Sequence, residues 1–293
     1  MKNNKQGDTQ QVDNKQVKNK GPKEGYCNIC GQHSQLTRDH IPPQAVSSAI
    51  PLKLRTLAQK LGTLPQFDTE VNEKSVLSQN GLWMRSLCGN CNNNLLGAKY
   101  DPELSAVSKQ VASLLRAQQE LGLHLPEPIK LKNVKPQRLI RAVIGHILAG
   151  RSPTLEQPRT SAPFAKALRN YFLDTSSNIA DEIEVYYWIY PNKEIVVING
   201  LMMFSGEGVI SGSCLLKFYP LAFWIVWDRP SSILINAQKI SKEKLRSLDE
   251  SCEIEVYLRN FPPLNYPEVP EQSKYSTIYN NDSTVLGEPK EQK

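Results

Sequence analysis

The sequence predicts an α+β fold with a small N-terminal module braced by cysteines, a helical middle and an antiparallel β-rich C-terminal part. Three observations support this prediction. Two Cys-x-x-Cys pairs lie within the first hundred residues, apolar residues recur at helical spacing from about 102 to 173, and runs rich in Val, Ile, Tyr and Trp begin at Glu184. The chain of 293 residues is long enough for about two domains of ~150 residues.

The N-terminal module, residues 25–101, is organised around Cys27, Cys30, Cys88 and Cys91. Thiolate is a ligand that Zn²⁺ prefers, and two residues between cysteines let a tight turn aim both sulfurs at one ion. The cysteines therefore predict a closed structural zinc site with Zn–S distances of ~2.3 Å. The alternative, four buried free thiols, would require two matched spacings by chance. The metal would stabilise a module too small to fold alone.

The order strand, strand, helix is expected within the module. Leu36 to Ile41 is predicted to be a strand that Pro42-Pro43 terminates. Leu82 to Leu87 is predicted to be the second strand, entered through a type I′ turn at Asn80-Gly81, and a short helix is expected from Asn90. Residues 44–75 have the character of an insertion, with one short helix predicted from Leu54, Leu57, Ala58 and Leu61.

The middle part, residues 102–176, is predicted to be helical. Asp101 is expected to cap the first helix, with Pro102 in the first turn and Glu103 favourable to the helix dipole. Further helices are expected from Pro136 to Gly150 and at about 162–173. The first two helices have apolar stripes formed by Leu104, Val107, Val111, Leu114 and Leu115, and by Leu139, Ile140, Val143, Ile144, Ile147 and Leu148.

The C-terminal part, residues 177–271, is predicted to be an antiparallel sheet, followed by a helix near 239–248 and a last strand near 252–258. The predicted sheet strands are Glu184–Tyr190, Glu194–Ile198, Gly208–Tyr219, Ala222–Trp227 and Ile233–Asn236. Residues 1–24 and 272–293 are mostly polar, so we expect a disordered basic tail at the N-terminus and a disordered tail at the C-terminus. No catalytic constellation is visible in the C-terminal half.

The net charge of +6 is unevenly distributed. Residues 105–169 contain eleven Lys and Arg against three Glu, a surplus of eight positive charges. Such a concentration suits a polyanionic partner, whereas the alternative is an ordinary solvated helical surface. Lys135, Arg138 and Arg141 would form an edge that binds a nucleic-acid backbone without reading its sequence.

Cysteine usage indicates a cytoplasmic protein. Beyond the two pairs, Cys214 and Cys252 are isolated, which fits metal ligation in a reducing compartment better than a disulfide scaffold. The N-terminal stretch lacks the apolar core of a signal peptide. The most apolar run, Leu215 to Trp227, is interrupted by Lys217 and Pro220 and is too short to span a bilayer. We therefore expect no membrane partner.

Asp39, His40 and Asn92 are the candidate catalytic residues. A histidine after Asp at a strand end can be structural, but the flanking cysteine pairs and an Asn directly after Cys91 favour a hydrolytic metal centre. Hard oxygen ligands suit Mg²⁺, which keeps several waters and takes its remaining ligands from phosphate. A neutral imidazole can take a proton from the attacking water.

The pattern C-x2-C … D-H-I-x-P … C-x2-C-N resembles the HNH (ββα-metal finger) endonucleases, and among them the zinc-stapled four-cysteine branch that includes the phage endonuclease VII type of junction resolvase. The resemblance covers roughly residues 25–101, with a longer stretch between His40 and Cys88 than the family pattern has. It implies that Asp39 and Asn92 bind Mg²⁺ or Mn²⁺, that His40 is the general base, and that the cysteines hold Zn²⁺. It implies DNA as substrate, and it is compatible with an effector role in bacterial restriction or phage defence, with a protein partner that targets or restrains cleavage.

Several residues near the module have two interpretations. Asp101 is favoured as an N-cap over an additional metal ligand, and His33 could compete with the cysteines for zinc. His146 lies among apolar helical positions and is expected to be structural. Arg38 contacts phosphate or is simply solvated. Two other functions also stay open: a non-catalytic zinc module that binds nucleic acid or a protein, and a nuclease that cleaves RNA.

Overall fold

The structure is a computed structural model. It describes residues 21–290 apart from gaps at 48–49, 56–75, 123–124, 152–161, 206–207, 209, 230, 232–234, 270–274 and 280–283. Within these residues no helix is long and apolar enough to cross a membrane.

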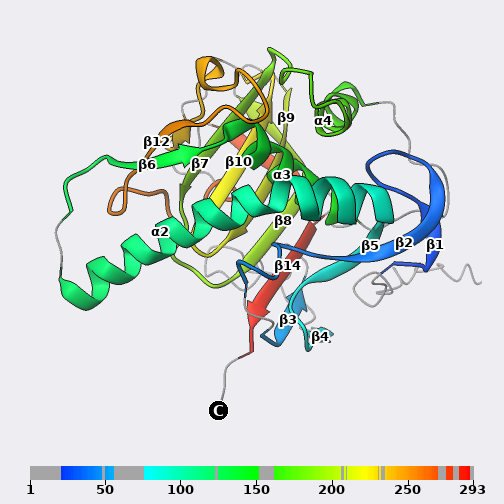
Figure 1. The fold of residues 1–293 in the computed structure, drawn as a ribbon, viewed down its shortest axis with the longest axis horizontal. Coiled ribbons are helices and arrows are strands. Elements are labelled where there is room, and N and C mark those ends of the chain that lie inside the picture. The colour runs from blue at the N-terminus through cyan, green and yellow to red at the C-terminus, as the bar shows by residue number, and fades with distance from the viewer. Residues whose placement is uncertain are drawn as a thin grey trace, which may run out of the picture.

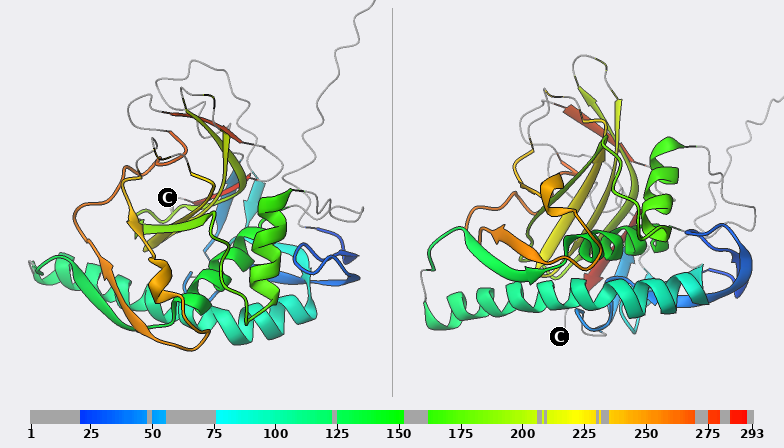
Figure 2. Two further views of the ribbon diagram at one scale, coloured as in Figure 1. Left: turned by 90° about the horizontal axis from the view of Figure 1, so that it is seen from above. Right: turned by 45° about the horizontal axis from the view of Figure 1, so that its top comes forward.

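A small antiparallel sheet lies at the N-terminus. Its strands β1 (Glu24–Tyr26), β2 (His33–His40) and β5 (Trp83–Cys88) are arranged in the order β1-β2-β5. Strand β5 leads directly into the π-helix η2 (Asn90–Tyr100), which continues as α2 (Asp101–Leu121). The two helices form one long rod, with β1 and β2 at its beginning (Figures 1 and 2). The rod ends at Gly122, whose φ of 60° is a left-handed conformation that glycine adopts without strain.

Helix α3 (Pro136–Ala149) is the central buried element. It contacts η2 and α2, strands β2 and β5 of the small sheet, and strands β8 and β9 of the large sheet. Every residue of α3 except Arg138 is buried. The helix is therefore covered on all sides, and not only along the apolar stripe that the sequence shows. Helix α4 (Pro163–Leu173) packs against α3 (Figure 1). Helix α3 therefore joins the N-terminal module to the large sheet.

In the part of the chain that the structure describes, the large sheet has nine strands, all paired antiparallel, in the order β11-β7-β10-β9-β8-β14-β3-β4, with β13 also paired to β8. Strands β6 and β12 form a separate antiparallel pair. The short 3₁₀-helix η3 spans Lys242–Lys244. The remaining strands are β3 (Leu52–Arg55), β4 (Val76–Ser78), β6 (Ile129–Val134), β7 (Ile183–Ile189), β8 (Ile195–Ser205), β9 (Ile210–Phe218), β10 (Leu221–Trp227), β11 (Gln238–Lys239), β12 (Cys252–Val256), β13 (Tyr275–Tyr279) and β14 (Thr284–Pro289).

The centre of the large sheet is covered on both faces, which explains why strand β10, Leu221–Trp227, is continuously apolar in sequence. Along β7, Tyr187 belongs to the core that contains α3, whereas Trp188 belongs to a second core on the opposite face. Over the Tyr190 ring of that second core lies the fully buried Lys217, whose Nζ lies 2.5 Å from Glu268 Oε1 and donates to the Leu264 carbonyl at 2.7 Å. A buried ammonium requires such partners, because it has lost its water.

The sequence-based prediction of a mixed α+β fold with antiparallel sheets is confirmed. The helices expected at 136–150 and 162–173 correspond to α3 and α4, and the strands expected at 82–87 and 252–258 correspond to β5 and β12.

Several predictions of local structure were wrong. The C-terminal tail expected to be disordered contains β13 and β14, and Glu24 of the N-terminal tail begins β1, whereas residues 1–20 lie outside the described part. Leu54 lies in strand β3 and not in a helix, while residues 57–61 of that predicted helix also lie outside it. No type I′ hairpin forms at Asn80-Gly81, because only Gly81 has a positive φ and the flanking strands pair with other partners. The helix expected near 239–248 is replaced by β11 and η3.

Candidate metal centre

The four paired cysteines converge. Their Sγ atoms all lie within 4.8 Å of one another, and Cys30 Sγ and Cys88 Sγ are 3.8 Å apart. A tetrahedron of four sulfurs around Zn²⁺, with bonds of ~2.3 Å, has edges of ~3.8 Å, whereas a disulfide would bring two sulfurs to ~2.05 Å. The cluster can therefore hold a metal ion and is compatible with structural zinc. His33 is exposed and packs edge-on against Tyr26, with ring centroids 5.0 Å apart, and is not part of the cluster.

Tight turns and hydrogen bonds aim the sulfurs inward. The N–H of Gly31 donates to the Cys27 carbonyl at 2.9 Å, and Gly31 has a φ of 71°, which an L-residue with a side chain rarely adopts. In the second pair, the N–H of Cys91 lies 3.5 Å from Cys88 Sγ. A hydrogen bond from the Cys91 thiol lowers the pKa of Cys27 to about 5, while burial raises the pKa of Cys30 to about 11. A bound cation would be needed to hold all four as thiolates.

The cysteine cluster is fixed to the end of helix α3 by side chains that the sequence analysis did not select. Asn28 Nδ2 donates to the carbonyls of Leu148 (3.0 Å) and Arg151 (2.9 Å), and Ser86 Oγ donates to the Ala149 carbonyl (2.7 Å). The last carbonyls of a helix have no partner within the helix, so these donors satisfy them. In the sequence, the available signal for this contact was a polar residue, Asn28, between two cysteines expected to bind a metal.

Asn92 holds the start of helix η2 against strand β2. Its buried side chain donates from Nδ2 to Thr37 Oγ1 at 2.9 Å and to the Arg38 carbonyl at 2.8 Å. A carbonyl oxygen only accepts, which fixes the amide orientation with Oδ1 on the other side. The structure thus brings Asn92 beside the backbone of the residue that precedes Asp39, as the predicted centre requires.

Asp39 and His40 are neighbours in β2 and differ in exposure, as alternation along a strand requires. Asp39 is 5% exposed, while His40 is partly exposed and its Nε2 lies 3.1 Å from Gln44 Nε2. His40 pairs with Trp83 across the β2–β5 ribbon. The two candidate catalytic side chains therefore lie on opposite faces at the end of one strand.

The face of the β2–β5 ribbon that carries His40 is basic. Arg38 lies two residues before His40 and pairs with Arg85 across the ribbon, so the three side chains share one face. Both guanidinium groups lie over the ring of Trp83, at 4.7 Å for Arg38 and 5.2 Å for Arg85. Arg38 is therefore exposed but held by an aromatic ring beside His40.

His146 of α3 and Asp101 of α2 lie next to Asp39. His146 is fully buried, with Nδ1 3.3 Å from Asp39 Oδ2 and Nε2 2.9 Å from Asp101 Oδ1. Burial opposes charging of the imidazole, but the carboxylates of Asp101 and Asp39 outweigh it and raise the pKa of His146 to about 10. For Asp39, burial raises the pKa of the carboxyl group, and the charge of His146 opposes this effect. The prediction of Asp101 as an N-cap was wrong: η2 continues into α2 without a break, no side-chain cap is formed, and the carboxylate binds His146.

Comparison of the chain with models of protein families, with curated protein sequences and with solved structures finds no match. What the centre does is therefore inferred from its residues.

The predicted backbone-binding edge does not form as expected. Arg141 is fully buried, where it donates to the carbonyls of Asp174 and Ser177 at 3.0 Å each and lies over the Tyr171 ring at 3.9 Å. Arg138 pairs with Asp249 and donates to the Lys99 carbonyl at 3.1 Å. Both arginines stabilise the packing of α3, so the surplus of positive charge in this segment overstated the charge available to a ligand.

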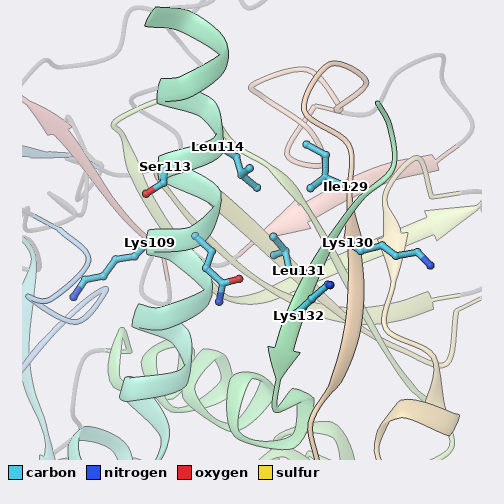
Figure 3. Close-up of a pocket in the computed structure, with 8 residues that line it drawn as sticks. Lys109, Ser113, Leu114, Ile129, Lys130, Leu131 and Lys132 are labelled. Carbon is cyan, nitrogen blue, oxygen red and sulfur yellow. The ribbon is translucent and has the colours of Figure 1, made fainter. Parts of the chain in front are cut away.

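Other cations of the same segment surround a groove of about 630 Å³ between α2 and β6. Leu114 and Leu131 lie between the two elements, Lys109 extends from α2, and Lys130 and Lys132 extend from β6 (Figure 3). All three lysines are exposed, and Lys130 lies 3.7 Å from Glu253. Lys109 is about two turns beyond Asp101, or about 12 Å along the helix axis.

Proposed function

We propose that this protein is a metal-dependent endonuclease that hydrolyses phosphodiester bonds of DNA, with an N-terminal ββα-metal finger of the HNH kind. The observation that supports this most is the hydrogen bond from Asn92 to the Arg38 carbonyl. It brings the residue after the last cysteine to the Asp39-His40 pair, as the motif requires. The four-cysteine cluster supports a structural Zn²⁺ that holds β5, and hence the beginning of η2, against the first cysteine turn.

The residues near Asp39 fit a divalent cation. Asp39 Oδ2 is a buried carboxylate oxygen that faces His146 Nδ1 at 3.3 Å and has no other partner among the described residues. Within the same residues, both hydrogen bonds of the Asn92 side chain leave from Nδ2, so that Oδ1 carries none there. Two hard oxygen donors suit Mg²⁺ or Mn²⁺. When bound, such an ion stabilises the charge that develops on the phosphoryl and leaving oxygens.

His40 would be the general base. With Gln44 Nε2 as the donor of the hydrogen bond at 3.1 Å, His40 Nε2 is the unprotonated ring nitrogen and therefore the atom that would accept a proton from water. Gln44 is exposed, so its amide can be replaced by a water molecule. Arg38 and Arg85, on the same face, would bind the phosphates that flank the scissile bond. The phosphodiester would lie at the end of β2, which carries Asp39 on one face of the ribbon and His40 on the other.

Plasmid cleavage tests this proposal. Full-length protein loaded with zinc is incubated with supercoiled plasmid and Mg²⁺ or Mn²⁺, beside His40→Ala and the matched control His33→Ala. We expect wild type and His33→Ala to nick the plasmid equally and His40→Ala to be slower by ~10²–10⁴-fold, the usual contribution of a general base. Equal cutting by wild type and His40→Ala would refute the role of His40.

One observation favours the alternative of a non-catalytic zinc module that binds nucleic acid or a protein. Asp39 is buried and lies against His146, as a purely structural carboxylate would. That alternative predicts no cleavage and unchanged nucleic-acid binding in His40→Ala. A parallel digestion of single- and double-stranded RNA separates a ribonuclease from a deoxyribonuclease. As an effector in bacterial restriction or phage defence, the nuclease would have a protein partner that targets or restrains DNA cleavage.

A further inference from the structure

We propose that His146 Nδ1 is a further protein ligand of the divalent cation, and that Asp101 orients this imidazole. The inference rests on the proposed function and deepens it. It places one ligand of the metal centre outside the finger, on the buried helix α3, and assigns the orienting carboxylate to Asp101, the first residue of α2.

The distance between Asp39 and His146 is the first argument. Asp39 Oδ2 and His146 Nδ1 form a buried ion pair with the two atoms 3.3 Å apart, and neither atom has a further hydrogen-bond partner among the described residues. Two neighbouring ligands of one ion, with bonds of ~2.1 Å, lie ~3.0 Å apart in an octahedral site and ~3.4 Å apart in a tetrahedral one. The pair thus has the separation of two ligands of a common ion.

The second argument comes from the other ring nitrogen. His146 Nε2 lies 2.9 Å from Asp101 Oδ1, so the neutral imidazole that donates this hydrogen bond carries its proton on Nε2. Without a metal ion, a second proton on Nδ1 lies between this atom and Asp39 Oδ2 at 3.3 Å, as the raised pKa of His146 implies, and a cation bound by both atoms would take the place of that proton. Metal-bound histidines almost always donate their other N–H to a carboxylate or carbonyl.

The position of His146 makes the arrangement rigid. The residue lies in α3, which is buried throughout its centre, and its carbonyl accepts the N–H of Gly150 at 2.9 Å. Among the described His, Cys, Asp and Glu residues, only the four cysteines form a ready group of three or more. Asp39 and His146 are a pair, and the amide oxygen of Asn92 would be the third ligand. One nitrogen and two oxygens favour Mn²⁺, and Co²⁺ more strongly, over Mg²⁺.

Binding of Mn²⁺ to the zinc-loaded protein, followed by electron paramagnetic resonance, tests the inference. Loss of the free Mn²⁺ signal gives the affinity, and electron spin-echo modulation detects a directly coordinated ¹⁴N. We expect that ¹⁴N signal in wild type, where Asp39 and Asn92 supply only oxygen. We expect it to be lost in His146→Ala, with affinity at least ~10–100-fold weaker, the loss typical even of an outer-shell partner. Asp101→Asn, which keeps an acceptor for Nε2, should retain the signal and bind ~10-fold more weakly.

His40→Ala is the matched control, since His40 acts on water in the proposed function and not on the metal. It should bind Mn²⁺ as wild type does and keep the ¹⁴N signal. Bound Mn²⁺ without a ¹⁴N signal, or a signal that persists in His146→Ala, overturns the inference but leaves the nuclease proposal standing when Asp39→Asn abolishes binding. Affinity that survives in Asp39→Asn as well overturns both. If His146→Ala fails to fold, the ¹⁴N signal of wild type and its survival in His40→Ala still decide the matter.

Discussion

Gly145→Ala tests the packing that connects the finger to helix α3. A methyl group on Gly145 would lie 2.5 Å from Leu96 Cδ1 and 2.7 Å from Phe172 Cε2. Carbon atoms prefer separations of ~3.5–4.0 Å, so each neighbour would have to move by about 1 Å. Leu96 and Phe172 are fully buried, and the Phe172 ring packs edge-on against Tyr100 with centroids 5.2 Å apart. Neither side chain therefore has space to retreat.

Two effects of opposite sign set the magnitude. Overpacking a core costs ~1–3 kcal/mol, and two contacts below 3.0 Å place this variant in the upper half of that range. Alanine is favoured over glycine within a helix by ~1 kcal/mol. We therefore expect Gly145→Ala to lower the free energy of unfolding of the zinc-loaded protein by about 1–2 kcal/mol, measured by urea denaturation.

A double-mutant cycle with Leu96→Ala isolates the contact. Leu96→Ala alone should cost ~2–5 kcal/mol through the cavity that it leaves, and the methyl group of Gly145→Ala would partly fill that cavity. The double variant should therefore be more stable than the sum of the single effects predicts, by ~0.5–3 kcal/mol. Additive effects, together with Gly145→Ala as stable as wild type, would show that α3 does not pack on η2 as described.

Three further predictions concern the zinc site, the lysine groove and the β-rich part. Chelation of the metal should unfold the N-terminal module, because binding energy of structural zinc is folding energy; far-ultraviolet circular dichroism unchanged after complete zinc removal would contradict this. Replacing Lys109 and Lys132 by Ala should reduce the slope of log affinity for DNA against log salt by ~2, while the exposed Lys193→Ala should not change it. Equal slopes in all three proteins would place the DNA elsewhere. Although burial opposes its charge, hydrogen bonds from Arg229, Lys239 and Tyr186 lower the pKa of Glu184 to about 2. Because this value is below that of an unfolded Glu, near 4.5, the contribution of Glu184 to stability is complete above about pH 5 and is lost as pH falls toward 2. Urea denaturation should therefore show a stability difference between wild type and Glu184→Gln at pH 6 that shrinks by pH 3.5, and a constant difference would refute this origin.

The sequence predicted the elements that carry a local sequence signal. Helix α3 could be predicted because Pro136 begins it and apolar residues recur along it, and β5 because it runs straight into the second cysteine pair. Strand β14 could not, because Thr284–Pro289 is short and polar around its apolar pair and is stabilised by pairing with β8 and β3. Leu54 was misassigned for the same reason: its spacing fits a helix, but its partner is Gly287.

The candidate site shows the same division. The cysteine spacing was sufficient to predict the cluster, because two residues between ligands determine the local turn. The neighbours of Asp39 could not be predicted, since His146 and Asp101 come from separate helices. Arg141 looked like a surface cation because its partners, backbone carbonyls of Asp174 and Ser177, have no sequence signature.

The position of strand β14 bears on how the chain folds as it leaves the ribosome. Arg55 pairs with Leu286, and β14 lies between β3 and β8, so both of these strands present open edges until β14 has been synthesised. Open edges recruit other strands, which makes the nascent chain a candidate for chaperone binding. Pairing between such distant residues also slows folding. A tag or truncation close to residue 284 would therefore reduce the yield of folded protein even though the cysteine cluster is far away in sequence.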